Sequence, residues 1–161
     1  MLTATQLKDA LEYDQTTGIF VWRKTRNRNK AGSRAGRVNS WGYIEIGYFG
    51  RSYSAHRLAW LYVYGAWPNN QVDHVNGDPA DNRISNLREC RQSQNNANMR
   101  KPTHNKSGFK GVAKAKANKW RAQIQVNRKQ IFLGLFITKE LAHTAYLDAA
   151  RRYFGEFARS A

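Results

Sequence analysis

Four polar residues in the middle of the chain are of the types that phosphodiester hydrolysis uses. Asp73 and His74 are neighbours, Asn86 follows a long turn-rich stretch, and Asn95 comes soon after it. Such hydrolysis needs a base that activates water, a metal ion that neutralises the phosphate, and a group that holds the base in place. Mg²⁺ prefers carboxylate and amide oxygens as ligands. The order therefore allows Asp73 and Asn95 to share one metal ion, with His74 across the phosphate and Asn86 steering the loop that carries it.

The elements that must position these residues are two short strands, a long loop and a helix. Adjacent residues of a strand point to opposite sides, so only a returning loop can bring later residues to Asp73 or His74. Residues such as Gly77 and Pro79 are typical of turns. The expected elements are a strand at 71–75, a loop at 76–86, a strand at 87–90, and a helix over about 94–100 that Ser93 caps and Pro102 closes.

The segment AHRLAW…VDHVNGDPADNRISNLRECRQSQNNAN resembles the HNH endonucleases of phage or homing type, also called ββα-metal or His-Me finger nucleases. The resemblance covers roughly residues 53–102. It implies that His74 is the general base, that Asn86 orients it, and that Asp73 and Asn95 hold one divalent ion, Mg²⁺ or Mn²⁺. The third letter of the motif is often histidine; the Asn95 found here favours a hard ion with oxygen ligands. Asn96 is the alternative ligand. An isolated Asp–His pair would mean little, whereas the full ordered set is specific.

Other residues near this motif have open roles. His56 is expected to be a packed or hydrogen-bonded structural histidine, with contact to the active-site loop or DNA as the alternative. Arg57 beside it could touch a phosphate. Asp78 and Asp81 are expected to be turn residues, although either could lie near the metal.

Charge points to a polyanionic partner. The chain has 161 residues, with 27 Lys and Arg against 11 Asp and Glu, which gives a formal charge of +16. Residues 1–52 hold 9 basic and 4 acidic residues, residues 53–102 hold 6 and 4, and residues 103–161 hold 12 and 3. Basic flanks around a balanced centre suit a protein that grips nucleic acid at both ends; a generic basic surface is the alternative. In the first flank the expected phosphate contacts are Arg23, Arg26, Arg28, Lys30 and Arg34.

Several classes of protein are excluded by composition. No stretch approaches the roughly 18 apolar residues that a membrane span needs. The N-terminal segment MLTATQLKDALEYD lacks the apolar core of a secretory signal, and the single Cys90 excludes an internal disulfide and a thiolate-rich zinc site. We therefore expect a cytoplasmic protein of a bacterial or phage-infected cell, without a small-molecule cofactor. Its oligomeric state is open, with a monomer favoured.

The C-terminal third predicts a separate small module. Strand-like runs cover residues 108–116, 119–126 and 129–136, with turns at 117–118 and 127–128, and Thr138 precedes a helix over about 139–154. The pieces GFKGV, KWRAQI, LGLF and AYLDAARRYFGEFA resemble the Apetala-type (ethylene-response-factor) DNA-binding domain. The resemblance implies a three-stranded sheet that lies in the major groove of double-stranded DNA, with one helix packed behind it.

Candidate DNA contacts follow from this second resemblance. Strand alternation places Arg121, Gln123 and Gln125 on one face, away from Trp120 and Ala122. Ala113 and Ala115 stand where the plant-type domain has arginines, so the base preference is open. The candidates by motif alignment are Lys110, Lys114, Lys116, Trp120, Arg121, Gln123, Gln125, Arg128 and Lys129. For Trp120, packing under the sheet is the alternative. The residues expected in the core are Phe132, Leu135, Phe136, Tyr146 and Phe154.

The predicted fold class is α+β: a ββα-metal nuclease core followed by a small three-stranded antiparallel sheet packed on one helix. The expected domains are an N-terminal basic α/β segment (1–52), the HNH core (53–102), a linker (103–106) and the Apetala-type domain (107–161). In the first of them we expect a helix at 4–13 and strands at 19–22 and 42–48, followed by a helix at 54–64 that Gly65 ends. The sequence thus predicts a metal-dependent DNA endonuclease. The rivals are a non-catalytic DNA-binding regulator with a decayed nuclease core and an RNA-binding basic protein.

Overall fold

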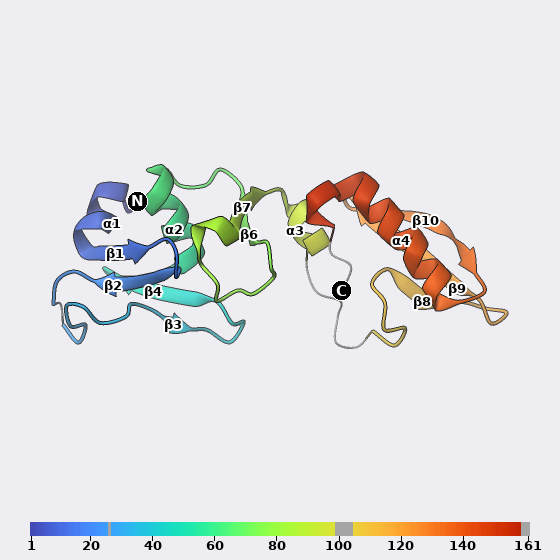
Figure 1. Ribbon diagram of the computed structural model, residues 1–161, viewed down its shortest axis with the longest axis horizontal. Coiled ribbons are helices and arrows are strands. Elements are labelled where there is room, and N and C mark those ends of the chain that lie inside the picture. Colours follow the sequence, from blue (N-terminus) through green and yellow to red (C-terminus); the bar gives the residue numbers. More distant parts are fainter. Residues whose placement is uncertain (26, 99–104, 159–161) are drawn as a thin grey trace. The chain divides into compact units, whose positions relative to one another are not determined.

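The computed structural model describes residues 1–25, 27–98 and 105–158 and divides into two compact units, Met1–Cys90 and Arg91–Ala161. Figure 1 labels most of their elements. The N-terminal unit contains α1 (Ala4–Ala10), β1 (Leu11–Asp14), β2 (Ile19–Trp22), β3 (Arg37–Val38), β4 (Ile44–Tyr48), β5 (Arg51–Ser54), α2 (Ala55–Tyr64), β6 (Gln71–His74), the 3₁₀ turn η1 (Ile84–Asn86) and β7 (Leu87–Cys90). The C-terminal unit contains α3 (Gln92–Asn98), β8 (Val112–Lys114), β9 (Trp120–Val126), β10 (Lys129–Phe136), α4 (Lys139–Phe154) and η2 (Gly155–Phe157).

The first helix is shorter than its sequence pattern indicates. Thr3 caps α1 through a reciprocal capping box, but the helix ends at Ala10, so the expected helix over 4–13 is wrong in its last turn. Leu11 and Tyr13 are buried while Glu12 and Asp14 are exposed, which is the alternation of a strand. These residues pair antiparallel with β2, whose predicted range is confirmed. Pairing with a second strand therefore overrides the local helical pattern.

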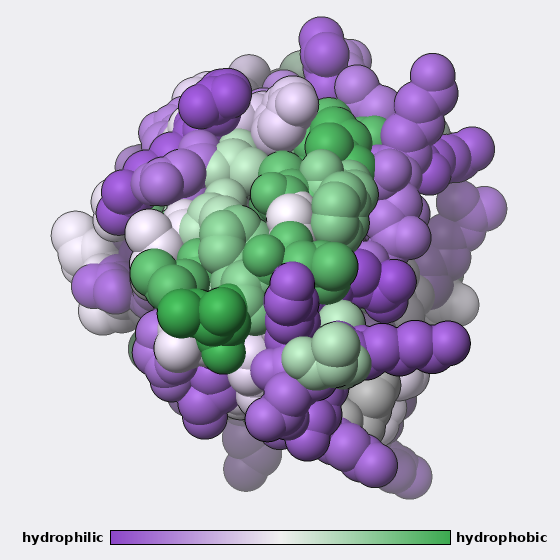
Figure 2. All heavy atoms as spheres, turned by 90° about the vertical axis from the view of Figure 1, so that its right-hand side faces the viewer, coloured by the Kyte–Doolittle hydropathy of each residue, from purple (hydrophilic) through white to green (hydrophobic). Residues whose placement is uncertain are grey.

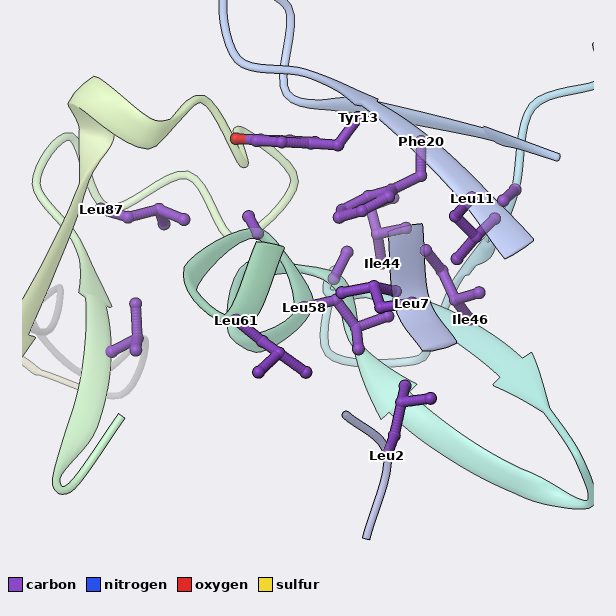
Figure 3. Close-up of a cluster of buried hydrophobic side chains, with 14 of the residues drawn as sticks. Leu2, Leu7, Leu11, Tyr13, Phe20, Ile44, Ile46, Leu58, Leu61 and Leu87 are labelled. Carbon is purple, nitrogen blue, oxygen red and sulfur yellow. The ribbon is translucent and has the colours of Figure 1, made fainter. Parts of the chain in front are cut away.

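One apolar cluster holds the N-terminal unit together. Figure 3 shows Leu7 of α1, Leu11 of β1, Ile46 of β4 and Leu58 of α2 pointing into it. These four side chains are each at most 1% exposed, so they are removed from water almost completely. The helix α2 ends, as predicted, at Gly65, which adopts the left-handed conformation (φ 76°) and donates to the carbonyl of Leu61.

The central hairpin follows its prediction closely. Strands β6 and β7 pair antiparallel, so that Asp73 lies opposite Arg88 and His74 lies opposite Leu87. The chain between them is a long turn-rich loop that ends in η1. The strand at 42–48 is also present and begins at Ile44 as β4, the middle strand of the order β3–β4–β5.

In the C-terminal unit, α3 begins at Gln92, so Ser93 lies inside the helix rather than capping it. The side chain of Gln94, the third residue of the helix, accepts a hydrogen bond from the N–H of Arg91 just before it (2.8 Å), which is one of the two contacts of a capping box. The domain borders at 52/53 and 102/103 stay predictions. Arg26, the end of the expected helix 94–100, Pro102 and residues 103–104 of the linker lie outside the described residues.

The three-stranded sheet has the order β10–β9–β8 and is antiparallel throughout. Residues 117–118 and 127–128 have positive φ angles, as expected for the two-residue turns that join strands of a hairpin. Helix α4 packs against all three strands, and Ala142 and Ala149 are buried on it. Thr138 caps this helix as predicted, because its side chain accepts from the Leu141 N–H.

Two residues expected in this core lie outside it. Phe132 and Leu135 are 61% and 51% exposed, whereas Tyr146 and Phe154 are buried and Phe136 packs on the buried cluster. The prediction for both is wrong: Phe132 pairs with Gln123 on the exposed face of the sheet, and a bulge between Phe132 and Gly134 turns Leu135 to that same face. The bulge adds a residue and shifts the alternation of the strand.

The mixture of helices and small antiparallel sheets confirms the predicted α+β class. The assignment of a ββα-metal core stays a prediction. Among the described residues, no helix is long and apolar enough to cross a membrane.

Gly18 shows how the first hairpin supports the central loop. It has φ +73°, and a Cβ added there would lie 2.6 Å from the Asn82 carbonyl carbon and closer still to the Arg83 nitrogen. These are backbone atoms, so they cannot rotate out of the way.

We predict that Gly18→Ala destabilises the protein by about 3 kcal/mol, because backbone strain adds to overpacking. Gly32→Ala is the matched control, since Gly32 has φ +78° with nothing within 4 Å, and it should cost only about 1 kcal/mol. Thermal or urea unfolding measures both. Equal losses for the two variants would contradict the packing of Gly18 on the loop.

Candidate active site

The hairpin β6–β7 and its loop bring the central polar residues together inside the N-terminal unit. Asp73 and His74 end the buried strand β6 and are 6% and 5% exposed. Asn82 and Asn86, which lie in and after the loop, are 2% and 7% exposed. Buried polar groups of this kind must find hydrogen-bond partners, and those partners define the site.

The imidazole of His74 contacts the side chain of Asn82. The distance from Nε2 of His74 to Oδ1 of Asn82 is 3.2 Å. The amide nitrogen of Asn82 donates to the Ala80 carbonyl (3.1 Å), which leaves Oδ1 turned to the ring. Oδ1 can only accept, so the neutral ring carries its proton on Nε2 and its lone pair on Nδ1. The loop therefore selects one tautomer of His74, with Nδ1 as the basic atom.

Asn86 holds the loop from inside. Its Oδ1 accepts from the Asn76 N–H (3.0 Å), and its Nδ2 donates to the side chain of Asn76 (3.0 Å) and the carbonyl of Asp81 (2.8 Å). The main chain closes the same loop through the Val75 N–H, which donates to the Asn86 carbonyl (2.9 Å). Asn86 thus fixes the conformation that carries Asn82, and Asn82 hydrogen-bonds to the His74 ring.

Asp78 and Asp81 serve as turn residues in the same loop. Asp78 accepts from the Ala80 N–H. Asp81 accepts from the side chains of Asn76 and Arg83, and the Arg83 hydrogen bond lowers the pKa of Asp81 to about 2. The turn role expected for both is confirmed by these contacts.

Two more aromatic residues surround His74. The ring of His56 lies edge-on to it with centroids 5.1 Å apart, and the ring of Tyr43 lies 5.9 Å from His74 and 5.5 Å from His56. His56 is buried, and its Nδ1 has no hydrogen-bond partner among the described residues. Burial, helped by the nearby His74, lowers the pKa of His56 to about 3.

Burial also lowers the pKa of His74, against the opposing effect of the Asn82 hydrogen bond. Both rings are therefore neutral at pH 7. A neutral His74 can accept a proton, which is the first requirement of a general base.

Asp73 is paired across the hairpin. Its Oδ2 accepts from Nε (3.2 Å) and from a terminal nitrogen (3.1 Å) of Arg88, whose side chain is 15% exposed. Such a buried pair compensates the charge of the carboxylate. The alternation of β6 turns Asp73 away from the side on which His74 points.

The predicted metal ligands fall in different units, Asp73 in the N-terminal unit and Asn95 in the C-terminal unit. Asn95 is half-buried on α3, and the exposed Asn96 accepts from the Gln92 side chain (2.9 Å) through its amide oxygen. Residues 1–25, 27–98 and 105–158 contain no group of three His, Cys, Asp or Glu side chains that could hold a metal ion. A carboxylate and amide oxygens nevertheless fit a hard cation, because Mg²⁺ keeps several waters and needs few protein ligands.

The first basic segment lies on the surface. Arg23, Arg28, Lys30 and Arg34 are exposed. Arg34 lines an open groove of about 790 Å³ together with residues that the sequence did not single out, namely Arg37, Tyr48, Phe49 and Arg51. A basic groove with aromatic walls is the kind of surface that tracks a nucleic-acid backbone. Arg57 lies apart from it, near the carbonyl of Asn70 and over the ring of Trp67.

The C-terminal candidates divide into two groups. The exposed or half-exposed ones on the sheet and its turns are Lys114, Lys116, Arg121, Gln123, Gln125, Arg128 and Lys129. Lys110 differs, because its ammonium donates to the carbonyls of Asn96 and Ala97 in the last turn of α3. This contact gives Lys110 a structural role at the helix end.

Comparison with known proteins agrees with this central site. The sequence model of a family described as HNH endonuclease matches residues 53–97. Protein 3.8 of Escherichia phage T7 is 32% identical over 108 residues, which make up 65% of this chain and 87% of that protein. The HNH homing endonuclease I-HmuI, in a structure of DNA binding and cleavage, is 26% identical with a TM-score of 0.43. That match covers 55% of this chain and 51% of the other, so the chain spans about half of its length. The chain therefore belongs to the family of phage T7 protein 3.8 and contains an HNH endonuclease domain.

Proposed function

We propose that the chain is a metal-dependent endonuclease that hydrolyses phosphodiester bonds of double-stranded DNA. The observation that carries the proposal is the neutral, oriented His74 beside a buried carboxylate, within the segment that the HNH endonuclease model matches. The net charge of +16 suits a polyanionic substrate, because lysines and arginines bind backbone phosphates.

In this proposal His74 is the general base. Nδ1 takes a proton from water as the water attacks phosphorus and the bond from phosphorus to the leaving 3′ oxygen breaks, and the ring becomes an imidazolium. The Nε2–H then strengthens its hydrogen bond to Asn82, because charged donors form stronger bonds. Asn86 acts one step further away, by holding the loop on which Asn82 lies.

Asp73 and Asn95, or Asn96 in its place, would hold one Mg²⁺ or Mn²⁺ ion. When bound, the ion supplies positive charge to the scissile phosphate and to the leaving oxygen. Arg88 keeps the Asp73 carboxylate in one orientation through its two hydrogen bonds.

The basic surfaces would bind the DNA backbone. In the N-terminal unit these are the exposed Arg23, Arg28, Lys30 and Arg34, and in the C-terminal unit the outer face of the sheet β8–β9–β10. We also propose that this sheet and its helix form an Apetala-type DNA-binding domain, and that the candidate residues on it contact DNA.

His74→Ala should abolish cleavage while leaving DNA binding intact, with a loss of roughly 10²- to 10⁴-fold in rate. Supercoiled plasmid with Mg²⁺ is the substrate, and nicked or linear product is measured with and without EDTA. His143→Ala is the matched control, since His143 belongs to the C-terminal unit. Wild-type binding without EDTA-sensitive cleavage, on several DNAs, would instead favour a regulator.

Asn82 should act as a positioning residue for His74. Asn82→Ala removes the acceptor and should lower kcat roughly 10- to 100-fold with little change in KM, as expected for a lost buried hydrogen bond. Asn82→Asp restores an acceptor and adds a negative charge, so the acid limb of the pH–rate profile should move to higher pH. A profile that stays in place in Asn82→Asp would argue for a purely structural role.

The buried histidines also predict how stability depends on pH. A histidine whose pKa is lowered on folding binds fewer protons in the folded state, so stability is complete above its ordinary pKa of about 6.5 and falls on acidification. For His56 the window runs from about 6.5 down to about 3. His56→Phe should flatten the slope by up to about 1.4 kcal/mol per pH unit. Unfolding between pH 7 and 4 tests this, and parallel curves for both proteins would contradict it.

A further inference from the structure

The outer face of the C-terminal sheet is partly apolar. Phe132 and Leu135 of β10 are 61% and 51% exposed. Figure 2 shows apolar side chains gathered on a face of this unit, with hydrophilic side chains around them. Exposed apolar patches rimmed by polar residues commonly mark an interaction surface.

The bulge in β10 is what places both side chains on the same face. Residues 132 and 135 would point to opposite faces of a regular strand, because side chains alternate. The register instead pairs Phe132 with Gln123 and Leu135 with Arg121, on either side of the bulge. On β9 the residues between and beside these partners, Ala122 and Ile124, are buried under α4. Phe132 and Leu135 therefore lie with Arg121 and Gln123 on the face opposite to α4.

The same face carries the groups that a DNA duplex would meet. Arg121 and Gln125 are exposed. Ala113 of β8 pairs with Arg121, and its short side chain does not cover the arginine. Residues 103–161 hold 12 basic against 3 acidic residues. The exposed Lys116 and Arg128 lie in the two hairpin turns beside this face, whereas Lys114 and Lys129, at strand ends, pair with Trp120 and Val126 on the side of α4. This charge favours a polyanion over an apolar segment of another protein.

We propose that Phe132 and Leu135 recognise the 5-methyl groups of thymine in the major groove of double-stranded DNA. This inference rests on the proposed DNA binding and adds a specificity to it. The thymine methyl is the apolar group that the major groove displays, and apolar side chains contact it there. Arg121, Gln123 and Gln125 supply polar contacts to neighbouring base edges or phosphates.

The 5-methyl group of thymine distinguishes this proposal from sequence-independent binding in the groove. Uracil pairs with adenine as thymine does but lacks the methyl group. Each methyl contact that is lost should weaken binding roughly three- to fivefold, the effect of one buried methylene. Contacts with phosphates are the same on both duplexes, so they contribute no difference.

The test uses the full chain in EDTA, so that no cleavage occurs, and fluorescence anisotropy. The probe is the plasmid fragment that the protein binds most tightly, made as two duplexes of identical sequence with either thymine or uracil throughout. Wild type should bind the thymine duplex at least threefold more tightly. Phe132→Ser with Leu135→Ser should bind both duplexes equally, near the wild-type affinity for the uracil duplex.

Tyr153→Ser is the matched control, since Tyr153 is 47% exposed but lies on α4, at the opposite face of the sheet. It should keep the wild-type preference. Loss of the preference in the double variant alone then separates a methyl contact from any effect of uracil on the duplex itself. Equal affinities of wild type for both duplexes would overturn the proposal while leaving DNA binding in place. Absence of binding to any duplex would overturn the proposed function as well. A double variant that only changes a dimer to a monomer would assign this face to a second copy of the chain and overturn the proposal.

Discussion

The hydrogen bond between His74 and Asn82 is the interaction on which the central site depends. It determines which nitrogen of a buried imidazole carries the proton, and so which atom can act as a base. Much of the surrounding structure holds the residue that makes it. Asn86 ties the loop to Asn76 and Asp81. The hydroxyl of Tyr13 donates to the Asn82 carbonyl (2.6 Å) and points toward the loop in Figure 3, and the turn at Gly18 packs on the same backbone.

Burial gives this hydrogen bond its chemical consequence. His56 and Tyr43 exclude water from one side of the His74 ring, and the low polarity keeps both histidines neutral at pH 7. Across the hairpin, Asp73 keeps its negative charge compensated by Arg88. The two strands thus keep a neutral base and a paired carboxylate apart, on opposite sides of β6.

The local parts of the fold could be predicted from the sequence, and the nonlocal parts could not. Strand β9, the cap at Thr138 and the end of α2 at Gly65 follow from alternation, capping and glycine, which act over a few residues. The end of α1 depends on pairing with β2, and the exposure of Leu135 depends on a bulge. Neither leaves a local signal. Asn82 was missed for the same reason, because hydrogen bonds inside an irregular loop place it. The Asp73, His74 and Asn86 motif was visible, yet the contact that orients the histidine was not.

The tautomer of His74 is the most direct measure of this account. Long-range ¹H–¹⁵N NMR of the folded protein at pH 7 distinguishes a proton on Nε2 from one on Nδ1 and from a charged ring. The account predicts a neutral His74 with its proton on Nε2 in wild type, and a mixture of tautomers in Asn82→Ala. A proton on Nδ1, a charged ring, or an unchanged spectrum in the variant would contradict it.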